Sequence, residues 1–177
     1  MSKQEEKSEE TKIYPLNDSW TLWYGPWDKI QKVYEITSIN DFWKVFNNIV
    51  DIPYLTFKKD YHFFKTGIQP TYEDPKNMEG GCINIEIKNE YIGKIWIYTL
   101  LGVIGMNFTD YENITGIVGS AKASGKSRIS LWVNTNKDVT ILNRIATEWK
   151  KMISKESYKL GFFPHSQVKS WNPSMVL

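Results

Sequence analysis

The 177-residue sequence predicts an α+β fold in a single domain of ordinary size. Two kinds of apolar pattern support this prediction. Three segments repeat their apolar residues at helical spacing, and at least six short segments have the alternation or the β-branched and aromatic composition of strands. Residues 1–12 are almost entirely Lys, Glu, Gln, Ser and Thr, so we expect a disordered tail before one folded domain at 13–177.

The first two strands are predicted near the start of the folded domain. Residues 20–24 are rich in strand-forming residues and end at Gly25 and Pro26, which is a turn signal. Residues 33–36 form the next strand, and Trp27 falls in the turn between the two. An indole in a turn either packs against its own strand ends or contacts a ligand, and the sequence leaves both interpretations open.

A capped helix is predicted next. Ser38 and Asp41 have the spacing of a capping box. The apolar stripe of this helix consists of Ile39, Phe42, Phe46 and Ile49. We expect the helix to stop near Pro53 and residues 51–65 to form a mixed aromatic and basic connection. Trp43 lies on the flank of the stripe, where it belongs either to the edge of the core or to a surface contact.

A half-buried strand and a second helix follow. Residues 83–88 alternate between apolar and polar side chains, and residues 91–105 have helical periodicity. One apolar face of this helix contains Ile92, Ile95, Trp96, Thr99 and Val103. On the opposite side Ile97 and Leu101 are also apolar, with Ile104 beside them. Either the helix is buried on all sides, or Ile97 and Leu101 belong to an exposed patch that binds a partner.

A basic loop at 122–128 follows a short strand at 116–120. The apolar residues of the next strand alternate, so Arg128, Ser130 and Trp132 share its other face. A basic loop leading into a strand suits contact with phosphate groups, and a solvated loop is the alternative interpretation.

The third helix is predicted to begin at Asp138. Its buried stripe consists of Ile141, Leu142, Ile145, Trp149, Met152 and Ile153. Residues 161–165 form one more short strand and a loop. These segments complete the α+β pattern.

The composition excludes several classes of protein. The 22 Lys and Arg residues against 20 Asp and Glu give a net charge of +2, which is not the broad basic surface of a duplex-binding protein. A single cysteine, Cys82, excludes an internal disulfide and a thiolate-rich zinc site, and with only His62 and His165 no metal centre is expected. No apolar run reaches signal-peptide or membrane-spanning length, so we expect a cytosolic or nuclear protein.

The segment at 67–75 is the main candidate for a binding loop. One glycine and two prolines within it forbid a regular helix and a central strand. It carries Tyr72 followed directly by Glu73 and Asp74. An aromatic face beside a carboxylate suits a flat, positively charged ring that donates hydrogen bonds from its edge. In the alternative interpretation, Tyr72 covers the core and the two carboxylates are solvated turn residues.

Together these features resemble the eukaryotic translation initiation factor 4E family, whose members bind the messenger-RNA cap. The resemblance covers residues 14–165. It is carried by Trp20-Thr21-Leu22-Trp23, Asp41-Phe42-Trp43, Gly67-Ile68-Gln69-Pro70-Thr71-Tyr72-Glu73-Asp74, Gly80-Gly81 and Trp96-Ile97-Tyr98-Thr99-Leu100-Leu101. It implies a curved antiparallel sheet of about eight strands with three helices on its convex face. The cap slot is then expected on the concave face.

The resemblance also implies roles for individual residues at the cap. Trp27 and Tyr72 match the two rings that sandwich 7-methylguanine, and Glu73 matches the carboxylate that accepts its N–H groups. Trp132 matches the indole near the methyl group. Methylation makes the base a delocalised cation, so two electron-rich ring faces favour it over plain guanine.

The same comparison implies a phosphate site and shows where this sequence departs from the family pattern. Lys122 and Arg128 match the basic positions of the family, and Lys126 is an additional candidate because this loop is one residue longer. Cys82 and Ser124 stand where cations are usual, Tyr72 stands where most members have Trp, and the loop before Trp27 is shortened. These differences bear directly on cap affinity.

On the opposite surface, a second set matches the dorsal patch of the family. It consists of Pro15, Ile39, Trp43, Ile97, Leu101 and Gly105. In the family this patch receives a Tyr-x-x-x-x-Leu-hydrophobic helix from the initiation scaffold or from repressor proteins. The resemblance would thus explain the apolar residues on the second side of the helix at 91–105.

The implied function is that of a monomeric translation factor that binds capped mRNA, without a cofactor, a membrane or catalytic residues. A repressor that binds the cap but not the scaffold is the alternative within this class. A nucleotide-processing enzyme using Glu73 and Asp74 is a rival from another class, although two carboxylates without a nearby His, Cys or third acid make poor metal ligands. A general single-strand binder would call for a longer basic groove than a net charge of +2 suggests.

Overall fold

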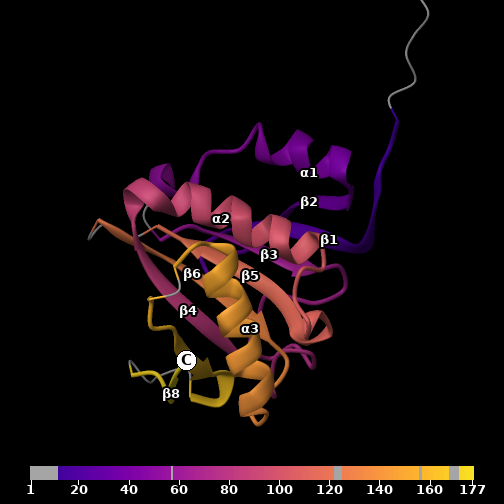
Figure 1. Cartoon of the computed structure of the whole chain (residues 1–177). Coiled ribbons are helices and arrows are strands. Elements are labelled where there is room, and N and C mark those ends of the chain that lie inside the picture. The colour runs from indigo at the N-terminus through magenta and orange to yellow at the C-terminus, as the bar shows by residue number, and fades with distance from the viewer. Residues whose placement is uncertain (1–11, 57, 122–124, 156, 168–171) are drawn as a thin grey trace, which may run out of the picture.

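A computed structural model describes residues 12–56, 58–121, 125–155, 157–167 and 172–177 (Figure 1). The predicted tail lies outside the described residues except for Lys12, and so do Lys122 and Ser124 of the basic loop. None of the helices in the described part is long and apolar enough to span a membrane. Within the same residues, no group of three or more His, Cys, Asp or Glu side chains is placed to hold a metal ion.

The described residues form one eight-stranded antiparallel sheet, as the family resemblance implies. The strands are β1 (Pro15–Gly25), β2 (Gln31–Ser38), β3 (Asp60–Lys65), β4 (Gly81–Lys88), β5 (Ile114–Ser120), β6 (Lys126–Val133), β7 (Gly161–Pro164) and β8 (Met175–Val176). Their order across the sheet is β2-β1-β3-β5-β6-β4-β7-β8. Segments far apart in the sequence therefore become neighbours.

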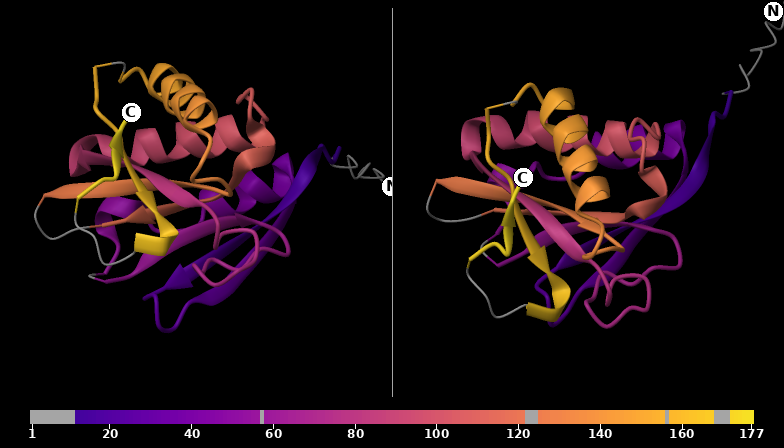
Figure 2. Two further views of the ribbon diagram at one scale, coloured as in Figure 1. Left: turned by 90° about the horizontal axis from the view of Figure 1, so that it is seen from below. Right: turned by 60° about the horizontal axis from the view of Figure 1, so that its bottom comes forward.

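Three α-helices cover one face of this sheet (Figure 2). They are α1 (Ile39–Phe46), α2 (Asn89–Ile104) and α3 (Val139–Met152). Short 3₁₀ turns lie at η1 (Ile52–Tyr54), η2 (Tyr111–Asn113) and η3 (His165–Gln167). The main core lies between the helices and the sheet, where Trp149 of α3 donates its indole N–H to Thr99 of α2 over 2.9 Å. The predicted fold class is confirmed.

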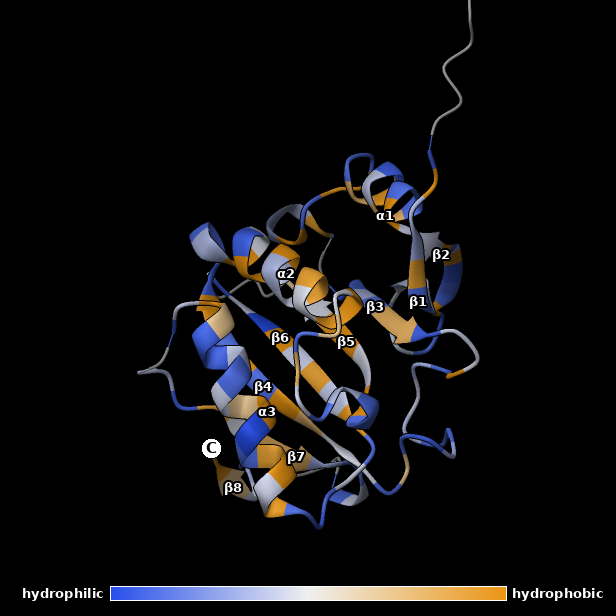
Figure 3. Cartoon of the chain, turned by 45° about the vertical axis from the view of Figure 1, so that its right-hand side comes forward, coloured by the Kyte–Doolittle hydropathy of each residue, from blue (hydrophilic) through white to orange (hydrophobic). Residues whose placement is uncertain are grey.

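Alternation along the central strands separates this core from the other face of the sheet (Figure 3). On β6, the side chains of Ile129, Leu131 and Val133 belong to the main core. Trp132 belongs to a separate small cluster on the opposite face, packed with Phe64. The predicted division of this strand into a core face and an open face is confirmed.

The capping box at the start of α1 is also confirmed. The Ser38 hydroxyl oxygen accepts a hydrogen bond from the backbone N–H of Asp41 over 3.0 Å. The Asp41 carboxylate accepts in turn from the Ser38 hydroxyl over 2.9 Å and from the backbone N–H of Thr37 over 3.2 Å. The hydrogen bonds from Ser38 and Thr37 lower the pKa of Asp41 by more than desolvation raises it.

The predicted end of this helix was wrong. α1 ends at Phe46 and does not continue to residue 49. The side chain of Asn48 donates to the carbonyl oxygen of Lys44 over 2.8 Å, which satisfies a carbonyl of the last turn. Asparagine side chains such as Asn48 compete with the helix through local bonds of this kind, and the apolar stripe gave no sign of this.

The interpretation of residues 51–65 as a connection was also wrong. They contain β3, an interior strand that pairs with β1 on one side and with β5 on the other. Five of its six residues, Asp60 to Phe64, are buried. A strand covered on both faces shows no simple apolar and polar alternation, so its sequence lacked the expected signal. β8 at the C-terminus was likewise not predicted.

The two open interpretations of α2 are resolved differently for different residues. Ile104 is buried at 5% exposure, so it belongs to the core. Ile97 and Leu101 are half-buried and pack against the core. The helix is therefore neither buried on all sides nor fully apolar on its outer surface.

Candidate functional site

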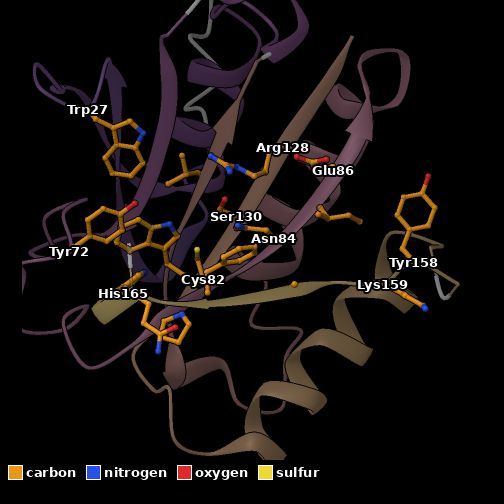
Figure 4. A pocket seen from close by; sticks show the side chains of 17 residues that line it. Trp27, Tyr72, Cys82, Asn84, Glu86, Arg128, Ser130, Tyr158, Lys159 and His165 are labelled. Atoms are coloured by element: carbon orange, nitrogen blue, oxygen red, sulfur yellow. The ribbon is translucent and has the colours of Figure 1, made fainter. Parts of the chain in front are cut away.

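The open face of the sheet carries a cavity of about 790 Å³ (Figure 4). Its lining comes from β4, β5, β6 and β7, from the loops before β2, β4 and β7, and from η3. Its lining residues are Trp27, Tyr72, Cys82, Asn84, Ile85, Glu86, Val118, Arg128, Ser130, Trp132, Tyr158, Lys159, Gly161, Phe163, Pro164, His165 and Gln167. This volume suits a nucleotide-sized ligand.

Three aromatic rings are gathered at one end of the cavity. Trp27, from the turn between β1 and β2, and Tyr72, from the loop between β3 and β4, have ring centroids 5.6 Å apart and planes 12° apart. Trp132 of β6 lies 5.1 Å from Tyr72 and 5.9 Å from Trp27, again with nearly parallel planes. The structure thus brings together three of the four residues predicted to bind a base. Parallel rings of this kind form a platform on which another flat ring can stack.

Two buried histidines lie directly behind this platform. The His62 ring is edge-on to Trp27 at 4.6 Å, and the His165 ring lies 4.2 Å from Trp132 and 5.0 Å from Tyr72. Burial lowers the pKa of His62 to about 4 and also lowers the pKa of His165. Both imidazoles are therefore neutral at neutral pH and do not repel a cationic ring.

A buried carboxylate connects Trp27 to the sheet. Burial raises the pKa of Asp60 on β3, while hydrogen bonds with Ser120 and Trp27 and the charge of Arg128 oppose that rise. Trp27 is 42% exposed, so this hydrogen bond and the ring contacts with His62, Tyr72 and Trp132 hold a residue that is largely open to solvent. The turn that carries Trp27 also begins at Gly25, whose φ of +138° favours glycine.

The middle of the cavity floor is polar, and the cationic side chains among the described lining residues are Arg128 and Lys159. Arg128 of β6 pairs in register with Glu86 of β4, and Cys82 pairs with Trp132. Burial raises the pKa of the Cys82 thiol to about 12, so this side chain is neutral. It does not replace the positive charge that the family usually has at this position.

Two of the predicted cap residues that the structure describes are not in the cavity lining. Glu73 and Lys126 are exposed and do not line it, although Glu73 follows Tyr72 directly. Lys122 lies outside the described residues. Of the predicted phosphate-binding residues, the structure places only Arg128 in the cavity, at a half-buried position on β6.

The six predicted partner-binding residues all lie at the helix-covered side or its edge. Trp43 of α1 is 40% exposed and packs edge-on against Phe42 at 5.0 Å. Ile39, Ile97 and Leu101 are half-buried, Pro15 is exposed at the start of β1, and Gly105 is exposed at the end of α2. A second hollow of about 410 Å³ lies next to this patch, lined by Tyr98, Leu101, Gly102, Asn107 and Met152.

Sequence reasoning did not identify His165 of the cavity lining, nor three residues that support the lining from behind. His62 and Asp60 were missed because the strand that carries them was missed. His165 stood out only as one of two histidines. Asn77, which lies under the Tyr72 loop, carried no signal beyond its position two residues after Pro75.

Comparisons with known proteins agree with this architecture. A sequence model of the family described as eukaryotic initiation factor 4E matches residues 15–175. Eukaryotic translation initiation factor 4E-1 of Solanum lycopersicum is 33% identical over 166 residues, which cover 88% of this chain and 71% of that protein.

Solved structures show the same likeness at lower identity. Ascaris suum eIF4E-3 in complex with an m2,2,7G cap is 26% identical with a TM-score of 0.85, covering 94% of this chain and 99% of that one. Schistosome eIF4E complexed with m7GpppG and 4E-BP is also 26% identical, with a TM-score of 0.86, covering 93% and 99%. The chain therefore belongs to the eukaryotic initiation factor 4E family of non-enzymatic translation factors.

Proposed function

We propose that this protein binds the 7-methylguanosine cap of mRNA in the cavity on the open face of its sheet. The observation that carries this proposal is the set of three nearly parallel rings, Trp27, Tyr72 and Trp132, at one end of the cavity. A methylated guanine is a flat cation, and stacking between electron-rich rings favours it over a neutral base by roughly 0.5–2 kcal/mol for each ring face. The two neutral histidines behind the rings leave that preference intact.

Guanine recognition is assigned to Glu73. An exposed carboxylate that directly follows Tyr72 can turn toward the edge of a base stacked on that ring. Two parallel N–H bonds from the base to one carboxylate are charge-assisted and select a guanine edge over an adenine edge. Glu73 thus acts as a hydrogen-bond acceptor that selects guanine, and not as a catalytic acid or base.

The phosphate chain of the cap is assigned to the floor and rim of the cavity beyond the rings. Arg128 lies two residues from Ser130 and four from Trp132 on β6, so it is about 13 Å along the strand from the base platform. Lys122 and Lys126 of the adjoining loop are assigned to the rest of the chain. With neutral Cys82 on the floor, we expect a weaker phosphate contribution than a fully basic floor would give.

On the opposite side, the patch around Trp43 is assigned to a partner helix carrying a Tyr-x-x-x-x-Leu-hydrophobic sequence. Trp43 on α1 is exposed, and Ile97 and Leu101 on α2 are half-buried. An exposed Trp is the type of anchor that dominates helix-in-groove binding. Schistosome eIF4E was solved with 4E-BP. Recruitment of an initiation scaffold through this patch would make the protein an initiator, and failure to bind a scaffold helix would make it a repressor.

Tryptophan fluorescence tests the cap assignment. The protein is titrated with 7-methyl-GTP and, in parallel, with GTP. We expect quenching with at least tenfold tighter binding of the methylated ligand, because the faces of Trp27 and Tyr72 attract a cationic base more strongly than a neutral one. Equal, weak binding of both ligands would contradict the proposal.

A matched pair of variants separates base recognition from general charge effects. Glu73→Ala should remove most of the 7-methyl-GTP binding. Glu79→Ala removes a carboxylate from the same loop, where it makes an exposed ion pair with Lys137 at 3.5 Å, and should leave binding unchanged. Equal losses in the two variants would show that Glu73 acts through charge alone.

A further inference from the structure

A fully buried asparagine lies under the loop that carries Tyr72. Asn77 has 0% exposure, and its side-chain amide donates to the backbone carbonyl oxygens of Gln69 and Thr71, both over 2.9 Å. These two carbonyls flank Pro70 and lead directly into Tyr72. The Asn77 side chain therefore fixes the two carbonyls on the approach to the ring, while the Asp74 carboxylate accepts from the backbone N–H of Gln69 over 2.8 Å.

The backbone of Asn77 makes three further bonds. Its N–H donates to the carbonyl oxygen of Asp74 over 2.8 Å, and its carbonyl oxygen accepts from the N–H of Gly80 over 2.9 Å. The same carbonyl oxygen accepts from Nδ1 of His165 over 2.7 Å. Asn77 thus forms hydrogen bonds within the loop between β3 and β4, and it also bonds to His165, which follows β7.

His165 extends this connection to the base platform. Its ring is buried and lies 5.0 Å from Tyr72 and 4.2 Å from Trp132. Because Asn77 accepts the proton of Nδ1, the orientation of the imidazole against both rings is set by that bond. Asn77 itself does not line the cavity, so it touches no bound ligand directly.

We propose that Asn77 is the positioning residue of the cap site, holding Tyr72 and Glu73 in register with Trp132 through the loop carbonyls and through His165. This inference rests on the proposed cap-binding function. Stacking and a bidentate carboxylate contact both depend on geometry, and displacement of a binding group by about 1 Å can cost a large part of its effect. The selectivity of the site should therefore depend on a residue that the ligand never touches.

The test compares Asn77→Ala with a matched control, Asn113→Ala. Asn113 donates from its side chain to Asn134 over the same 2.9 Å. Like Asn77, Asn113 does not line the cavity. We expect Asn77→Ala to weaken 7-methyl-GTP binding at least tenfold and to lower its preference over GTP. Asn113→Ala should leave both quantities unchanged, whatever its effect on the melting temperature.

Binding of a Tyr-x-x-x-x-Leu-hydrophobic peptide to the opposite face reports whether the rest of the fold is intact. It should be unchanged in Asn77→Ala. An affinity for 7-methyl-GTP and a methyl preference equal to those of the wild type would overturn the inference while leaving the proposed function in place. Failure of the wild-type protein to bind 7-methyl-GTP would overturn the proposed function, and the inference with it.

A second variant keeps the inference testable if Asn77→Ala does not fold. His165→Phe retains a ring against Tyr72 and Trp132 but cannot donate to the carbonyl oxygen of Asn77. We expect it to lower the preference for 7-methyl-GTP over GTP at least threefold. An unchanged preference in a folded His165→Phe protein would overturn the part of the inference that runs through this bond.

Discussion

The rings of Trp27 and Tyr72 lie 5.6 Å apart with their planes 12° from parallel, so they face each other at less than the spacing of a base sandwich. A base between two rings requires about 7 Å, which is two van der Waals contacts of 3.5 Å. Tyr72 is held by the bonds around Asn77, whereas Trp27 is 42% exposed on a short turn. Trp27 is therefore the ring that has to move when a base enters.

The first prediction uses two exposed tryptophans as mutual controls. Trp27→Ala should lower 7-methyl-GTP affinity more than tenfold, because base–aromatic stacking is worth about 1–3 kcal/mol. Trp43→Ala should leave that affinity unchanged and weaken binding of a Tyr-x-x-x-x-Leu-hydrophobic peptide. The two side chains are 42% and 40% exposed, so neither substitution should greatly change thermal stability. Calorimetric titration with both ligands checks this, and loss of both activities in either variant would contradict it.

A second prediction concerns the size of the stacking ring. Tyr72→Trp should raise 7-methyl-GTP affinity by about threefold, because an indole offers a larger and more electron-rich face to a cation. Tyr72→Phe is the control, since it keeps the present ring size and should change affinity less. Fluorescence titration measures both. A weaker Tyr72→Trp variant would show that Trp132 and His165, at 5.1 Å and 5.0 Å, leave no room for the larger ring.

A third prediction concerns the neutral cavity floor. Cys82→Arg should raise 7-methyl-GTP affinity by about tenfold, because a hydrogen bond to a charged group contributes about 1.5–3 kcal/mol. It should have little effect on 7-methylguanosine, which lacks phosphates. Cys82→Met is the neutral control. Equal gains for nucleoside and triphosphate would place the new side chain on the base and not on the phosphates.

A fourth prediction follows from the two buried histidines. The pKa of His62 is lowered to about 4, so the unfolded chain binds a proton below about pH 6.5 while the folded protein does not. Stability is therefore lost as the pH falls from 7 toward 4, and His165 acts in the same direction. We expect the free energy of unfolding in urea to be about 1 kcal/mol lower at pH 5.5 than at pH 7 for His62 alone.

The control for this pH effect is His62→Phe, which removes the titrating group but keeps a ring beside Trp27. Its free energy of unfolding should fall less over the same pH interval. An identical fall in the variant and the wild type would assign the effect to other groups.

Segments with a strong single periodicity could be predicted from the sequence. β4 alternates between buried and more exposed side chains, β6 alternates between apolar core residues and the residues of its other face, and α3 has a polar outer side, so these elements could be assigned from sequence. Hydrogen bonds between residues close in the sequence could also be predicted, as for the capping box of Ser38 and Asp41. β3 was not readable, because a strand buried on both faces is not amphipathic.

The sequence by itself determined the residue types of the candidate site: a ring in a turn, Tyr72 with an adjacent carboxylate, and Arg128 and Trp132 on one face of a strand. Only the tertiary structure decided that Trp27, Tyr72 and Trp132 meet, and that Asn77 and His165 lie behind them. Trp27 and Tyr72 are 45 positions apart in the sequence, and Tyr72 and Trp132 are 60 positions apart. Their proximity depends on the strand order β2-β1-β3-β5-β6-β4-β7-β8, which is set by long-range pairing and core burial and not by any local pattern.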